Sequence, residues 1–239
     1  MSKKILIVGS GNAALSAGIA SLEKGAEVLI YEKADKKMAG GNTKYTAGAM
    51  RFSYNSGDEL IDLLDNPNDV RLKDTDFGSY TKEKFKSDLL SFNDGRPLSW
   101  EQEILVSKSL ETIQWLSSHD VKFEPIYSRQ SFIKEGKHIF WGGLTLASEN
   151  EGVGLFNQEL SAFLSLGGNI IYESPVTDLI LKDNKIRGIC LGKDKIEADA
   201  VILASGGFEA NDNLRKSFIG DDWLKAKVRG TPHNTGDGL

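Results

Sequence analysis

Residues 5–33 read ILIVGSGNAALSAGIASLEKGAEVLIYEK, and this stretch decides the fold class. The run 5–8 is apolar and rich in β-branched residues, as in a strand buried on both faces of a parallel sheet. A glycine turn follows, and 12–24 has the composition of a helix that stops before Gly25. A second apolar run over 28–31 ends at Glu32. The order strand, glycine turn, helix, strand predicts an α/β protein with a parallel sheet.

Each residue of the glycine turn has a physical task in binding a nucleotide. Gly9 permits the tight turn, and Gly11 lets a pyrophosphate approach the backbone because it has no side chain. The helix N-terminus offers N–H groups and a partial positive charge to the phosphates. Glu32 is placed to accept hydrogen bonds from ribose hydroxyls. A βαβ unit with a purely structural role is the alternative, and the whole context favours nucleotide binding.

The helix over 12–24 is expected to pack closely against the sheet. Ala14 stands where a third glycine is common and still permits that approach. The predicted buried face consists of small side chains, namely Ala13, Ala14, Ala17, Ala20 and Ser21.

Composition and charge exclude several classes of function. The 239 residues are 40% hydrophobic and 26% charged, with a net charge of −5 and no basic cluster, so nucleic acid is not an expected partner. No apolar run approaches membrane-spanning length. The first strand begins so early that no signal peptide fits before it, and we expect a cytoplasmic protein. The single cysteine, Cys190, excludes internal disulfides, and no two histidines have metal-ligand spacing, so no metal is expected.

Two further regions suggest a cofactor longer than NAD. After Glu32 the chain makes a small-residue loop, KADKKMAGGNTKYTAGAM, whose glycines can bring N–H groups to a second part of a long cofactor. Towards the other end, a helix over 152–166 is followed by a predicted β-meander and a buried strand over 200–204. That strand leads into Ser205, Gly206 and Gly207, where another close backbone approach is expected. The middle region, 57–125, is predicted to be a helical excursion that returns to the same domain.

Five motifs in order carry a family resemblance: VGSGNAAL, IYEK, GGNTKYTAGAM, VILASGGFE and NTGDG. Together they resemble the flavoprotein family of fumarate reductases and succinate dehydrogenases. The segments YTKEKFKSDLLSF, ETIQWLSSHDVKFEP and FWGG are more specifically similar to the tricarballylate dehydrogenase branch. The resemblance implies a Rossmann-like FAD-binding domain over 1–239. It also implies that the family's capping and catalytic part would follow NTGDG. We therefore expect this chain alone to be inactive and leave its catalytic residues unassigned.

The resemblance assigns cofactor-binding positions motif by motif. Those implied at the pyrophosphate, ribose and adenine are Gly9, Gly11, Asn12, Ala13, Ala14, Glu32, Lys33, Val176, Ala204, Ser205 and Gly206. Those implied on the flavin side are Gly40, Gly41, Asn42, Thr43, Ala47, Gly48, Thr235, Gly236 and Asp237. Membrane-bound relatives attach flavin through a histidine in the loop that matches 42–50. That loop has no histidine here, so non-covalent FAD is implied.

The implied reaction is hydride transfer between flavin N5 and a small di- or tricarboxylate, with an unknown electron partner. An NAD(P)-binding dehydrogenase or reductase and a non-catalytic nucleotide-binding subunit are the alternatives. Of the three histidines, His233 is the best functional candidate because it adjoins NTGDG. Orientation of that loop is an equally good interpretation of its role.

Overall fold

The computed structural model describes residues 2–239 and divides into two compact units. One unit comprises the chain up to Thr46 together with Phe156–Leu239, and the other is Ala47–Leu155. The predicted helical excursion, 57–125, lies within the second unit, which is longer and contains strands as well as helices. Each of these strands has only two to four residues, too few for an alternating pattern to reveal it in the sequence.

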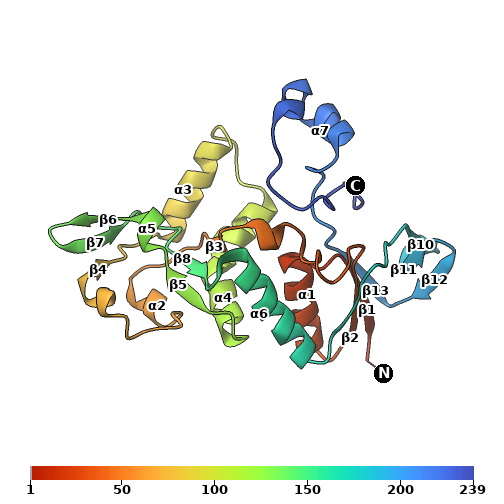
Figure 1. Ribbon diagram of the computed structural model, residues 1–239, viewed down its shortest axis with the longest axis horizontal. Coiled ribbons are helices and arrows are strands. Elements are labelled where there is room, and N and C mark those ends of the chain that lie inside the picture. Colours follow the sequence, from red (N-terminus) through yellow and green to blue (C-terminus); the bar gives the residue numbers. More distant parts are fainter. Residues whose placement is uncertain (1) are drawn as a thin grey trace. The chain divides into compact units, whose positions relative to one another are not determined.

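The first unit is built on a parallel sheet, as predicted. Its strands are β1 (Lys4–Val8), β2 (Glu27–Tyr31), β9 (Asn169–Ile171) and β13 (Ala200–Leu203), in the order β13-β1-β2-β9. Val8 pairs with both Tyr31 and Leu203, so three strands end level at their carboxyl ends. Figure 1 shows β1 between β2 and β13, with α1 beside them.

Helix α1 (Asn12–Glu23) buries a different face from the one expected. Its buried residues are Ala14, Leu15, Gly18 and Ile19, whereas Ala13 is exposed. The prediction followed a row of small residues, of which Ala14 is buried as expected, but the larger Leu15 and Ile19 side chains bury more apolar area and set the rotation of the helix. Gly18 allows the close contact, because a Cβ atom there would stand 2.6 Å from the ring of Phe163. Phe163 belongs to α6 (Glu151–Ser165) and is fully buried.

An antiparallel meander follows β9, as predicted. It consists of β10 (Asp178–Lys182), β11 (Lys185–Leu191) and β12 (Asp194–Glu197). Asp183 and Asn184 form the first turn with positive φ angles of 52° and 57°. Ile189 of β11 is buried in one cluster with Leu6 and Tyr31, which joins the meander to the parallel sheet.

The second unit has its own aromatic core and two three-stranded sheets. The sheets have the orders β3-β8-β5 and β4-β7-β6. Phe52, Tyr54 and Phe123 are the largest fully buried side chains of its core. Its elements are β3 (Ala49–Met50), α2 (Asp58–Ile61), η2 (Val70–Asp74), β4 (Thr75–Asp76), α3 (Lys82–Phe92), α4 (Trp100–Ser118), β5 (Phe123–Pro125), α5 (Tyr127–Gln130), β6 (Ser131–Lys134), β7 (Lys137–Phe140) and β8 (Leu146–Ser148).

Three short helical elements complete the first unit: η1 (Gly41–Tyr45), α7 (Asp212–Phe218) and η3 (Asp221–Lys225). The buried Arg215 side chain fixes the fold of the C-terminal segment. Its guanidinium donates to the carbonyl oxygens of Trp223 and Ala226 at 3.0 and 3.2 Å. Within residues 2–239, none of the helices combines the length and hydropathy that crossing a bilayer requires.

Candidate functional site

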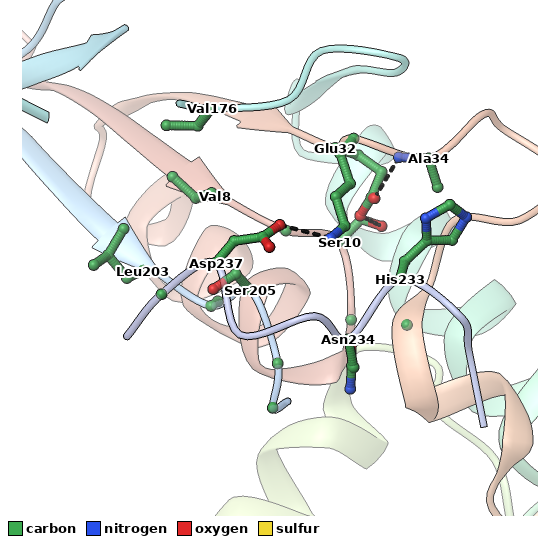
Figure 2. Close-up of a pocket in the computed structure, with 18 of the residues that line it drawn as sticks. Val8, Ser10, Glu32, Ala34, Val176, Leu203, Ser205, His233, Asn234 and Asp237 are labelled. Atoms are coloured by element: carbon green, nitrogen blue, oxygen red, sulfur yellow. Dashed lines mark hydrogen bonds and ion pairs between the residues drawn. The ribbon is translucent and has the colours of Figure 1, made fainter. Parts of the chain in front are cut away.

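A cavity of about 650 Å³ lies at the carboxyl ends of β1, β2 and β13. The carboxyl end of a parallel sheet is where open α/β folds bind ligands, and the volume suits a small molecule or cofactor. Figure 2 labels Ser10, Glu32, Ser205 and Asp237 among its lining residues. The walls come from 8–13, 31–34, 41–43, 176–179 and 203–208, from Met38 and from the C-terminal segment that begins at Thr231.

The turn after β1 is a cradle that excludes side chains. Gly9 has a φ of +99°, and a Cβ atom there would stand 2.4 Å from the carbonyl oxygen of Ala204. At Gly11 a Cβ atom would stand 3.3 Å from the Thr43 hydroxyl. That hydroxyl accepts a 2.8 Å hydrogen bond from the backbone N–H of Asn12, the first residue of α1. The turn therefore presents backbone rather than side chains to the cavity, as close approach of a phosphate requires.

Glu32 is buried at the end of β2 and is also a link between segments. One carboxylate oxygen accepts from the Ser10 hydroxyl at 2.5 Å, and the other accepts from the Ala34 N–H at 2.8 Å. Ser10 in turn accepts from the Gly40 N–H at 3.0 Å. Figure 2 shows the Glu32 side chain reaching Ala34 beside Ser10. Each carboxylate oxygen can accept a second hydrogen bond, so these contacts leave capacity for a ribose hydroxyl.

Lys33 joins the end of β2 to the C-terminal segment. Its ammonium donates to Asp237 at 2.6 Å and to the Thr235 hydroxyl at 2.7 Å. Burial raises the pKa of the Asp237 carboxyl, but hydrogen bonds from Lys33 and Thr235 outweigh that effect and bring the pKa below its ordinary value. Asp237 is therefore a carboxylate at neutral pH, and it holds Lys33 within the wall of the cavity.

Glu209 connects three segments, and it is not among the site residues expected from the sequence. It accepts a hydrogen bond from the Asn42 side chain and another, at 2.8 Å, from the Asn234 side chain. The side-chain amide oxygen (Oδ1) of Asn42 also accepts from the Thr231 N–H at 2.9 Å. The quoted motif VILASGGFE contains Glu209, so the signal was present. The role of Glu209 cannot be read from the motif alone, because its partner Asn42 lies 167 positions away in the sequence.

The structure brings most of the predicted site residues together. Those that line the cavity are Gly9, Gly11, Asn12, Ala13, Glu32, Lys33, Gly41, Asn42, Thr43, Val176, Ala204, Ser205, Gly206 and Asp237.

Six predicted residues do not line this cavity. Ala14 lies on the buried face of α1, Gly40 donates to Ser10, and Thr235 contacts Lys33. At Gly236, with a φ of +86°, a Cβ atom would stand 2.4 Å from a methyl group of Leu214. Ala47 and Gly48 belong to the second unit, and their place beside a flavin stays a prediction.

Among the histidines of residues 2–239, only His233 lines the cavity. Its backbone N–H donates to the Thr231 hydroxyl at 3.2 Å, which fits the expectation that this loop is held in a set orientation. His138 stacks edge-on against Tyr127 in the second unit, and His119 caps the end of α4. Within residues 2–239, no group of three or more His, Cys, Asp or Glu side chains is arranged to hold a metal ion.

Comparison with known proteins decides the family. The model of the FAD binding domain matches residues 4–239, which is nearly the whole chain. The chain belongs to the FAD binding domain family. FAD is therefore its cofactor, and the cradle formed by Gly9 and Gly11 fits the diphosphate of that group.

Relatives of this FAD-binding domain are longer proteins. The fumarate reductase (cytochrome) of Shewanella frigidimarina is 27% identical over 244 residues, which cover 98% of this chain and 38% of that protein. The NADH:acrylate oxidoreductase of Vibrio harveyi is 24% identical over 292 residues, with 98% and 28% covered. An open flavocytochrome c3 fumarate reductase structure superposes with a TM-score of 0.71 at 20% identity, covering 99% of this chain and 39% of that one. This last likeness shows the fold.

Proposed function

We propose that this chain is the FAD-binding part of a flavin-dependent oxidoreductase that acts on a small di- or tricarboxylate. Two of its relatives are named for fumarate and acrylate, which are both unsaturated carboxylates. That shared chemistry is the single observation that carries the proposal. Within the class, the helical-region resemblance favours tricarballylate-like acids over fumarate.

Different residues of the cavity bind different parts of FAD. The turn from Gly9 to Gly11 and the N-terminus of α1 bind the diphosphate. Glu32 accepts from the ribose hydroxyls while Ser10 and the Ala34 N–H keep its carboxylate in place. Asn42 and Thr43 approach the flavin side, along with Gly41. Bound FAD supplies the redox chemistry, by exchanging a hydride with a substrate carbon at N5.

The site lacks one group that carboxylate recognition calls for. Arginine binds carboxylates through two parallel hydrogen bonds, yet no arginine of residues 2–239 lines the cavity. We propose that the groups that hold the substrate carboxylates and transfer the proton come from outside this cavity. A non-catalytic nucleotide-binding subunit stays the alternative. The match of this chain to the FAD binding domain family argues against an NAD(P)-binding dehydrogenase or reductase.

Anaerobic spectroscopy of the FAD-loaded protein tests the proposal. In a full-length product that supplies the substrate-binding groups, succinate and tricarballylate should bleach the oxidised flavin, and fumarate and acrylate should restore the colour of the chemically reduced flavin. Lactate and a simple aliphatic alcohol are the matched controls and should do neither. Residues 1–239 alone should bind FAD and respond to none of these acids. A full-length product that binds FAD but responds to none of the four acids would exclude carboxylate chemistry and favour the non-catalytic alternative. Rapid bleaching of residues 1–239 alone would instead mean that the catalytic residues lie within this chain.

A further inference from the structure

A carboxyl group lies buried against α1, beside the cofactor cradle. Glu159 of α6 has 0% of its surface exposed. One of its oxygens accepts a 2.8 Å hydrogen bond from the Ser16 hydroxyl, on the second turn of α1. The FAD-holding residues assigned above do not include Glu159, and a buried acid without a cation is costly to keep ionised.

The second contact of Glu159 is the side-chain amide of Asn12. One end of that amide lies 2.7 Å from Oε1 and 3.1 Å from Oε2 of Glu159, and 3.1 Å from the Ser16 hydroxyl oxygen. Asn12 also lines the cavity. Within residues 2–239, the other end of the amide makes no side-chain hydrogen bond. Asn12 therefore contacts Glu159 and is also part of the wall of the cofactor cavity.

The protonation state of Glu159 determines which amide orientation is favourable. A neutral carboxylic acid can donate to the amide oxygen, which leaves the NH₂ group at the far end. A carboxylate can only accept, so it requires the NH₂ group on its own side and leaves the amide oxygen at the far end. Phosphate oxygens are acceptors, so only the first orientation offers them a hydrogen-bond donor.

The surroundings of Glu159 favour the neutral acid near neutral pH. Burial raises the pKa of the Glu159 carboxyl to about 8, with a smaller opposing effect from the Ser16 hydrogen bond. On α1 it faces only Asn12 and Ser16, and no Lys, Arg or His of residues 2–239 lies within ion-pair distance of it. On η1, the Lys44 ammonium lies over the Phe156 ring and donates to the Lys37 carbonyl oxygen. On β2, both Glu32 oxygens are bonded to Ser10 and Ala34.

We propose that Glu159 is a positioning residue for FAD binding: as a neutral acid it holds the Asn12 amide with its NH₂ group toward the diphosphate, and as a carboxylate it reverses the amide. Glu159 does not touch the cofactor and acts through Asn12. The inference goes beyond the proposed function, because it depends on cofactor binding alone and holds whatever the substrate is.

The pH dependence of FAD affinity tests this role. FAD is titrated into the apoprotein between pH 6.5 and 9.5, and binding is followed by quenching of tryptophan fluorescence. The dissociation constant should be steady at the acid end and rise through pH 8, to roughly 30-fold weaker at pH 9.5 if only the neutral form is competent. ADP carries the diphosphate but lacks the flavin ring and the ionisation of that ring, so its dissociation constant should rise in the same way above pH 8.

Three variants separate positioning from a merely structural role. Glu159→Gln cannot ionise, so its affinity should not depend on pH in this range. Ser16→Ala removes a hydrogen bond that favours the carboxylate, so the midpoint of the profile should move to higher pH. Glu151→Gln, on the exposed first turn of α6, is the matched control and should keep the profile of the unaltered protein.

A flat profile in the unaltered protein would overturn the proposal, and so would a Glu159→Gln protein that keeps the pH dependence. Circular dichroism establishes whether each variant folds. If Glu159→Gln does not fold, the Ser16→Ala midpoint decides the matter, because an unchanged midpoint contradicts the proposal. Substrate turnover enters none of these measurements, so their failure is distinct from failure of the proposed function.

Discussion

At the scale of single residues, Glu32 combines a binding role with a structural one. The expected acceptor for the ribose is also the point where the Ser10 turn and the strand leading to Ala34 meet. A buried carboxylate with two protein donors is well positioned, and its remaining lone pairs need no reorganisation to accept another hydrogen bond. The same contacts mean that removing Glu32 leaves buried donors without partners.

Glu32→Ala should therefore weaken FAD binding and also lower stability. Losing hydrogen bonds to a charged acceptor costs about 1.5–3 kcal/mol, which is one to two decades in affinity. Isothermal titration of the folded apoprotein measures the first effect, and urea unfolding measures the second. Glu32→Gln keeps the shape of the side chain and one acceptor, so its FAD affinity and its stability should lie between those of the unaltered protein and of Glu32→Ala. An unchanged FAD dissociation constant in folded Glu32→Ala would assign the residue a structural role alone.

At the scale of elements, the contact between α1 and α6 depends on one glycine. Gly18 lies inside α1, where alanine would ordinarily be the better helix former by about 1 kcal/mol. The Phe163 ring occupies the space that the added methyl group would need. Propensity and packing therefore predict opposite signs for the same substitution, and packing should win because the ring is fully buried.

Gly18→Ala is expected to destabilise the protein by about 1–3 kcal/mol, the typical cost of overpacking. Urea unfolding followed by circular dichroism gives the change in free energy. The double variant Gly18→Ala/Phe163→Leu should recover part of the loss, since leucine frees space beside the new methyl group. If Gly18→Ala raises the unfolding midpoint instead, the helices do not pack as closely as described.

At the scale of the whole molecule, the chain gathers distant segments around one cofactor. The loop 42–50 has no histidine, which predicts non-covalent FAD. The fold adds His233, which reaches the cavity from near the C-terminus. Acid precipitation of the FAD-loaded protein should release all of the flavin into the supernatant. A yellow pellet would contradict non-covalent binding, and loss of that colour in His233→Ala would then locate the attachment.

The sequence by itself determined the βαβ unit, the meander and the expectation of a dinucleotide. These depend on local physics: apolar runs form strands, glycines permit positive φ, and Gly9 and Gly11 admit a phosphate. The predicted buried face of α1 was wrong, because the side chains that bury the most area are determined by packing against α6 as well as by the helix itself. The short strands of the second unit were missed because a few residues carry no period.

Only the tertiary structure decided which polar groups meet. Lys33 and Asp237 pair across 204 positions, and Ser16 meets Glu159 across 143. The local sequence around Glu159 does not predict its burial, because a glutamate on a helix is ordinarily a polar residue that faces water. Its burial comes from packing against α1, and burial is what makes its charge expensive. Local periodicity fixes the elements, whereas the energy of a polar group depends on partners that the chain supplies from far along its length.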